Sequence, residues 1–317
     1  MIIAVFPGQG SQTPGFLAPW LELDGARERL AGYSELAQVD LIAAGTAWDA
    51  DRIRDTQVAQ PLIVAASLLS WHALAALNAG RLDGVAGHSV GEIAALVAAG
   101  VLSDDDGMRL VGIRGRAMAE AAALETTGMS AVLGGDQDAV VARLEELDLT
   151  PANYNGGGQI VAAGALDALA ALSAEPPASA RVIALQVAGA FHTRFMAPAV
   201  ETLRSAAADV AATDPSTRLW TNRDGSEVAT GRAALDLLVD QVASPVRWDL
   251  CMASFGDNGV SGIIEFAPAG TLTGLAKRGL RGTPTVAVKT PDDLAAAAEL
   301  LRSTSDAQSG STTGGVA

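Results

Sequence analysis

The chain has 317 residues, 49% of them apolar and 18% charged, and a formal net charge of −15. Such an apolar fraction can fill a core, which excludes a wholly disordered chain. The negative charge disfavours nucleic acid as a partner, because a polyanion would be repelled at long range. The single cysteine, Cys251, excludes an internal disulfide and a cysteine-based zinc site, and we predict no metal site.

No membrane association is expected. The first residues lack the basic region and long apolar stretch of a signal peptide. The most apolar later segment, 62–77, contains polar side chains and is predicted to be too short and too mixed to span a bilayer. We therefore expect a soluble, cytoplasmic protein, and nothing in the sequence demands more than a monomer.

Short apolar runs followed by glycines characterise the N-terminal part. Residues 2–6 are predicted to form a buried strand that ends in a tight loop at 7–10. Gln60-Pro61 is predicted to open a buried helix, with proline at its first position. A second short strand at 84–87 leads into a helix at 92–99. The alternation of buried strands and helices indicates an α/β domain with a parallel sheet.

The middle of the chain has a different pattern. It predicts, in order, a strand, a helix capped by Asp136, a hairpin with a glycine turn, a second helix and a last strand: 128–134, 137–147, 152–155 with 159–163, 166–172 and 181–187. The order β-α-β-β-α-β is that of a ferredoxin-like subdomain. We place it at 126–188, inserted into a large hydrolase-like domain of residues 1–125 and 189–302.

The C-terminal part returns to the large domain. Residues 263–266 predict another buried strand. Ser, Thr, Gly and Ala dominate residues 303–317 without periodicity, and we predict a flexible tail there.

A candidate nucleophile lies between the second strand and its helix. Gly87-His88-Ser89-Val90-Gly91 matches G-x-S-x-G, the turn that lifts a serine hydroxyl clear of a sheet. The flanking positions must be small, and the following helix N-terminus favours a nearby oxyanion. Ser89 is therefore predicted to be a nucleophile, the alternative being a serine that only caps the helix.

A serine nucleophile needs a base, and the chain has three histidines. His72 is expected on a packed helix, and His88 is adjacent to Ser89 and points elsewhere. His192 remains, 103 residues after Ser89, and is predicted to be the general base by elimination. Spacing does not identify the group that orients its ring: an acidic side chain or a backbone carbonyl can do so.

The chain resembles the malonyl-CoA:acyl carrier protein transacylases over residues 1 to about 300. Six segments occur in that family's order: Pro7-Gly8-Gln9-Gly10-Ser11-Gln12, Gly87-His88-Ser89-Val90-Gly91-Glu92, Arg114-Gly115-Arg116-Ala117-Met118, residues 155–159, Ala190-Phe191-His192 and Pro245-Val246-Arg247-Trp248. That family carries a ferredoxin-like insert in a hydrolase-like domain, in agreement with the pattern above.

The resemblance implies a two-step transfer without a bound cofactor. Ser89 attacks the thioester of malonyl-CoA with His192 as base, and a phosphopantetheine thiol of acyl carrier protein then collects the malonyl group. The backbone N–H groups of Gln9 and Val90 are implied as oxyanion donors. The alternative for Gln9 is a plain turn.

Other roles are also implied by the resemblance. Arg114 matches the clamp for the malonyl carboxylate, which a guanidinium binds bidentately. Asn155 and Phe191 match substrate-binding positions, Phe191 as in members that use malonyl units. Gln241 matches the residue whose backbone carbonyl orients His192. Without the family, Arg114 belongs to a solvated helix face, Asn155 to a turn and Gln241 to a helix end.

One loop departs from the family pattern, and a basic cluster follows it. Many members carry Gly-Pro-Gly after the late strand, where this chain has Ala267-Pro268-Ala269-Gly270. The departure puts fine positioning in doubt, not the chemistry. Lys277, Arg278 and Arg281 follow and are candidate contacts for phosphates or an acidic carrier protein; the alternative is a solvated helix end.

Two competing functions stay open. A serine acyl hydrolase acting on carrier-bound acyl groups would use the same serine and histidine. A catalytically silent carrier-binding subunit would need neither. The pathway that the carrier serves, fatty acid or polyketide synthesis, is not determined.

Overall fold

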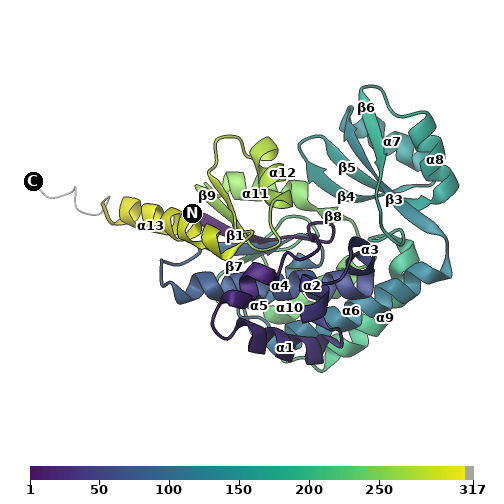
Figure 1. The fold of residues 1–317 in the computed structure, drawn as a ribbon. Coiled ribbons are helices and arrows are strands. Elements are labelled where there is room, and N and C mark those ends of the chain that lie inside the picture. The colour runs from purple at the N-terminus through teal and green to yellow at the C-terminus, as the bar shows by residue number, and fades with distance from the viewer. Residues whose placement is uncertain (311–317) are drawn as a thin grey trace, which may run out of the picture.

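The computed structural model describes residues 1–310, which form two five-stranded sheets (Figure 1). All neighbours in the first sheet are parallel. Its strands, in spatial order, are β10 (Thr285–Ala287), β9 (Gly262–Glu265), β1 (Ile2–Phe6), β2 (Gly84–Gly87) and β7 (Arg218–Trp220). The predicted strands at 2–6, 84–87 and 263–266 are thereby confirmed within one residue.

Helices cover both faces of this sheet, and its central strand β1 is accordingly apolar and buried along its whole length. Side chains alternate along β1: Ile2, Ala4 and Phe6 join a core with α4 and α5, whereas Ile3 and Val5 face α11 and α12. The helices of this domain are α1 (Ala26–Ala37), α2 (Leu41–Thr46), α3 (Ala50–Arg54), α4 (Thr56–Ala76), α5 (Gly91–Ala98), α6 (Asp104–Leu124), α9 (Ala197–Ala208), α10 (Gly231–Gln241), α11 (Trp248–Asp257), α12 (Thr271–Gly279) and α13 (Leu294–Gly310), with short 3₁₀ turns at Ala18–Glu22, Arg194–Met196 and Pro291–Asp293.

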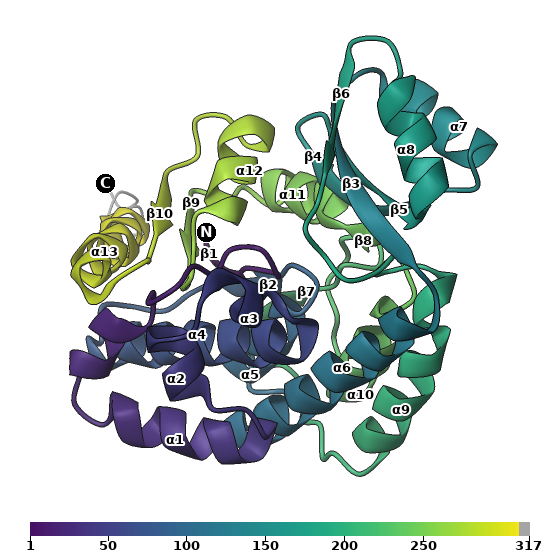
Figure 2. The same cartoon turned by 45° about the vertical axis from the view of Figure 1, so that its right-hand side comes forward.

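The second sheet belongs to the inserted segment and confirms the ferredoxin-like order. Figure 2 shows α7 (Gln137–Glu146) and α8 (Leu166–Ala174) packed together on one side of it. Their apolar faces and the sheet make a separate small core, which includes Val132, Leu144 and Ile160. The strand order is β6 (Ala180–Ala184), β3 (Thr127–Gly134), β5 (Gln159–Ala165), β4 (Thr150–Gly156) and β8 (Val246–Arg247).

The fifth strand of this sheet was not predicted. β8 comes from outside 126–188 and pairs in parallel with β4, Asn153 with Val246 and Tyr154 with Arg247. Two residues are too few to give a strand pattern in the sequence, and only the pairing identifies them. The second sheet therefore includes a strand from the large domain. The domain boundaries at 125/126 and 188/189 stay a prediction. At the other edge, β6 ends at Ala184, three residues before the predicted end.

The predicted start of the long buried helix is wrong. α4 begins at Thr56, where the Asp55 side chain accepts a hydrogen bond from the Gln57 backbone N–H, so Pro61 lies inside the helix. The resulting 21-residue helix is long and apolar enough to cross a membrane by length and composition, contrary to the expectation for 62–77. However, 72% of its apolar window is buried inside the protein, as in a core helix.

The predicted tail is also partly wrong. α13 continues to Gly310, through the first part of the segment 303–317. Once a helix is nucleated, each further residue adds one hydrogen bond, and no proline or glycine interrupts the sequence before Gly310. The rest of the predicted tail, 311–317, lies outside the described residues.

Candidate active site

Ser89 lies on a sharp turn between β2 and α5, in a conformation that L-residues rarely adopt (φ 51°). The turn is possible only because Gly87 and Gly91, two residues to either side of Ser89, lack side chains. A Cβ on Gly87 would lie 2.0 Å from the Gly91 carbonyl carbon, and a Cβ on Gly91 would lie 2.2 Å from the Phe6 carbonyl oxygen. The strand–turn–helix geometry predicted for the G-x-S-x-G segment is therefore confirmed, with Ser89 in a strained backbone conformation.

His192 contacts Ser89, as predicted. Its Nε2 is 2.7 Å from Ser89 Oγ, and its Nδ1 is 2.8 Å from the Gln241 backbone oxygen. A carbonyl oxygen only accepts, so Nδ1 carries the proton and Nε2 presents a lone pair to the serine hydroxyl. The orienting group left open by the spacing is thus a backbone carbonyl, and the Gln241 contact implied by the family is present.

The His192 ring is neutral in this setting. Burial, together with the positive charge of Arg114, lowers the pKa of His192 to about 3. A neutral imidazole is the form that can accept the Ser89 proton.

A pocket of about 240 Å³ opens beside Ser89 and His192. The parallel strands β1 and β2 end in register, Phe6 opposite Gly87, so the loops that carry Gln9 and Val90 start side by side. Within residues 1–310, neither the Gln9 nor the Val90 backbone N–H has a hydrogen-bond acceptor. Both residues line the pocket, and both donors are free for an oxyanion.

Arg114, on α6, does not line the pocket and has only 1% of its surface exposed, but it contacts Gln60 and Ser89, which do line it. Its guanidinium donates to Gln60 Oε1 at 2.7 Å and Gln241 Oε1 at 2.9 Å, and one of its nitrogens is 3.4 Å from Ser89 Oγ. All three acceptors are neutral, and Nε has no partner. Burial lowers the pKa of Arg114 to about 10, so the cation persists at neutral pH. A solvated helix face, which was the alternative for Arg114 without the family resemblance, is therefore wrong.

The remaining predicted residues line the same pocket. Asn155, on β4, accepts a hydrogen bond at Oδ1 from His88 Nε2, 2.9 Å away. This bond occupies His88, in agreement with its exclusion as the base. Phe191 lines the pocket one residue before His192 and is almost fully buried. The inserted subdomain therefore contributes part of the pocket wall, at the edge where β4 meets the large domain.

Three further polar residues complete the site and had no predicted role. Gln60 accepts a hydrogen bond from Arg114. Glu92 is the last residue of the segment Gly87-His88-Ser89-Val90-Gly91-Glu92, and Asn222 lies two residues after β7. Asn222 Oδ1 accepts the Ser89 backbone N–H at 2.7 Å, and its Nδ2 donates to the Gly87 oxygen. Burial raises the pKa of Glu92 to about 8, opposed by the Asn222 N–H and the Arg114 charge. No local sequence signal marks Asn222, because its bonds to Ser89, Gly87 and Glu92 join residues 130 or more positions apart.

The loop that departs from the family pattern is firmly held. Ala269 adopts a left-handed conformation (φ 50°), which a glycine would adopt without strain. The buried carboxylate of Glu265 accepts hydrogen bonds from the backbone N–H groups of Gly270, Leu272 and Thr273. Leu272 then lines the pocket, so the substitution costs backbone strain without loosening this wall.

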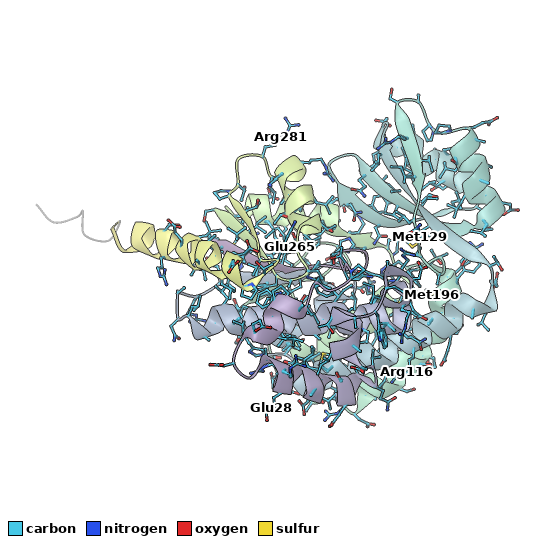
Figure 3. All side chains as sticks on the ribbon, viewed as in Figure 1. Glu28, Arg116, Met129, Met196, Glu265 and Arg281 are labelled. Carbon is cyan, nitrogen blue, oxygen red and sulfur yellow. The ribbon has the colours of Figure 1, made fainter. Side chains whose placement is uncertain are left out.

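The predicted basic contacts are exposed around the end of α12. Arg278 donates to Gln159 at the glycine turn of the inserted hairpin, which bridges the two parts of the protein. Figure 3 shows Arg281 at the outer edge of the molecule, in the loop after α12. In the described part of the chain, no group of three or more His, Cys, Asp or Glu residues could hold a metal ion.

Comparison with known proteins gives one consistent result. The model of the family described as acyl transferase domain matches residues 4–308. The malonyl CoA-acyl carrier protein transacylase of Mycobacterium tuberculosis (strain H37Rv) is 56% identical over 296 residues, which cover 93% of this chain and 98% of the relative. That of Escherichia coli K12 is 33% identical, with 93% and 98% covered.

Solved structures agree. A crystal structure of MCAT from M. tuberculosis superposes with a TM-score of 0.91 at 55% identity, covering 95% of this chain and 100% of that one. A malonyl-transacylase in complex with its type II PKS acyl-carrier protein gives 0.88 at 30% identity, with 94% and 99% covered. On sequence and on fold alike, the chain belongs to the malonyl-CoA:acyl carrier protein transacylase family, whose members carry an acyl transferase domain.

Proposed function

We propose that this acyltransferase moves a malonyl group from malonyl-CoA to the phosphopantetheine thiol of acyl carrier protein, through an ester on Ser89. One observation carries the choice of acyl group: a buried guanidinium, with only neutral acceptors, lies 3.4 Å from the Ser89 hydroxyl. Burying a cation is costly, and the Glu92 carboxylate reaches this one only through Gln241. A substrate carboxylate would supply a counter-charge in direct contact.

The first half-reaction forms the acyl-enzyme. His192 Nε2 takes the proton of Ser89 Oγ as that oxygen bonds to the thioester carbonyl carbon. The carbonyl oxygen becomes an oxyanion and is held by the N–H groups of Gln9 and Val90. The C–S bond then breaks, and the His192 proton goes to the CoA sulfur.

The second half-reaction runs the same steps in reverse. The carrier thiol gives its proton to His192, and its sulfur bonds to the ester carbonyl carbon. Collapse of the oxyanion breaks the bond to Ser89 Oγ, which recovers the proton. No cofactor or metal is needed for either step, because only protons and an acyl group move.

Residues around the acyl group set its position. Arg114 is proposed to hold the malonyl carboxylate in place of one of its amide partners, with Asn155 and Phe191 forming the pocket wall. A bulky ring at Phe191 disfavours an α-methyl branch, by about 1–3 kcal/mol for a single methyl group.

The carrier is proposed to approach over the end of α12. Lys277, Arg278 and Arg281 are exposed there and offer positive charge to phosphates and acidic side chains, on a protein whose net charge is −15. Neutralising the three would raise the KM for the carrier and reduce its dependence on salt. The cytoplasmic location and the monomeric state stay predictions.

The experiment is a transfer assay with radiolabelled malonyl-CoA and holo carrier protein. Label on the carrier, well above free malonate, is the expected result. Mostly free malonate would instead identify a serine acyl hydrolase, and absence of any malonyl adduct on Ser89 would identify a catalytically silent carrier-binding subunit. Repeating the assay with fatty acid and polyketide carriers would show which pathway the protein serves.

A further inference from the structure

Glu92 is a buried acid that the transfer chemistry does not use. It lies in the first turn of α5, three residues after Ser89, and only 3% of its surface is exposed. An ionisable side chain this deeply buried is costly, so its contacts need an explanation. These contacts lead to the Ser89 turn through Asn222 and to Arg114 through Gln241.

The two carboxylate oxygens of Glu92 accept from different partners. Oε1 accepts the backbone N–H of Asn222, and Oε2 accepts the side-chain amide Nε2 of Gln241. A carboxylate can accept at both oxygens, whereas an amide or a protonated carboxyl places a donor at one of them. The two donors therefore favour the ionised form of Glu92, which they and the Arg114 charge stabilise against the effect of burial.

The side-chain amide of Gln241 connects Glu92 to Arg114. Its Nε2 also lies 3.2 Å from the Ser89 carbonyl oxygen and 3.2 Å from Asn222 Oδ1, so three acceptors surround one amide nitrogen. This arrangement leaves Gln241 Oε1 facing Arg114 at 2.9 Å. If the amide turned over, its NH₂ group would face a guanidinium, and two donors would meet.

We infer that Glu92 is a positioning residue for acyl-group selection: by fixing the side-chain amide of Gln241, it keeps an acceptor against Arg114 and holds the guanidinium beside Ser89. Glu92 itself touches neither substrate nor the reacting atoms. The inference rests on the proposed malonyl transfer, because it assigns Arg114 to the malonyl carboxylate.

The test compares malonyl and acetyl loading of Ser89 in the full-length protein. Glu92→Gln places an amide donor against either Gln241 or Asn222. In an assay above pH 8, the value to which burial raises the pKa of Glu92, malonyl loading should fall about 10- to 100-fold. Acetyl loading, which does not need the guanidinium, should change less than about threefold.

Two controls separate this role from general support of the fold. Asp104→Asn removes a partly buried carboxylate that accepts from Tyr33 and His72 away from the pocket, and it should leave the malonyl-to-acetyl ratio at the wild-type value. Gln241→Met removes the amide but keeps the backbone oxygen that orients His192. It should lower the ratio as Glu92→Gln does, and it supplies the test if the Glu92 variant does not fold.

The double variant shows whether Glu92 acts through Gln241. If it does, adding Glu92→Gln to Gln241→Met changes the ratio no further. Equal loss of malonyl and acetyl loading in Glu92→Gln, or an unchanged ratio in Gln241→Met, would overturn the inference. A wild-type protein that does not prefer malonyl over acetyl would instead overturn the proposed role of Arg114.

Discussion

The two sheets of this protein contribute to one pocket in different ways. The parallel sheet is buried on both faces, and the loops at its carboxyl end carry Ser89, Gln9 and Asn222. The mixed sheet has its own small core and contributes only wall residues such as Asn155. Chemistry therefore depends on the domain that holds its groups rigidly, whereas the insert shapes the space beside them. The following substitutions test that division.

The largest effect should come from Ser89→Ala, in the parallel-sheet domain. The acyl-enzyme bond then has no oxygen to form on, and transfer should fall by on the order of 10⁴-fold or more. Mass spectrometry of the intact protein after exposure to malonyl-CoA should show no adduct. A persistent adduct of normal stoichiometry would mean that another residue carries the acyl group.

Arg114→Ala should come next, with an effect limited to dicarboxylic acyl groups. Loss of a bidentate charge-assisted contact should lower malonyl loading about 10²- to 10⁴-fold, and acetyl loading by less than about 10-fold. Stopped-flow loading rates with both thioesters give the comparison. Arg116→Ala is the matched control, since Arg116 lies on the same helix and donates to the Ala37 backbone oxygen. Equal losses for both thioesters would contradict the proposal that Arg114 binds the malonyl carboxylate.

Acid should destabilise the large domain through His192. The pKa of His192 is about 3 in the folded protein, below its ordinary value near 6.5, so the unfolded chain binds an extra proton between these values. The free energy of unfolding should fall as pH falls through this window, by at most about 1.4 kcal/mol per pH unit from this group. His192→Asn should show a shallower slope in denaturant titrations; identical slopes would contradict the neutral buried ring.

The smallest effect should come from the insert. Asn155→Ala removes one hydrogen bond to His88 and part of the pocket wall, and kcat/KM for malonyl-CoA should drop no more than about 10-fold. The Ser89 adduct should still form. A loss as large as that of Arg114→Ala would show that the inserted subdomain takes part in the chemistry, and the division between the two sheets would fail.

The sequence by itself determined the parts of this protein that depend on neighbouring residues. The glycines around Ser89 predicted the strained turn because only their missing side chains allow it. The apolar runs predicted three of the five strands of the parallel sheet and four of the five strands of the second sheet, and missed β7, β10 and β8. Elimination among three histidines left His192 as the base. The family resemblance added Arg114, Gln9 and the Gln241 carbonyl, which periodicity alone placed in ordinary helix faces and turns.

Tertiary structure decided what depends on distant contacts. β8 is a strand only because β4 pairs with it. The start of α4 before Pro61, by contrast, follows from a local cap by Asp55 that the sequence carries and the prediction missed. Asn222 joined the site through bonds to Ser89 and Gly87, and Glu92 through bonds to Asn222 and Gln241. A hydrogen bond between residues more than a hundred positions apart leaves no period or spacing in a sequence, because it exists only after the chain has folded.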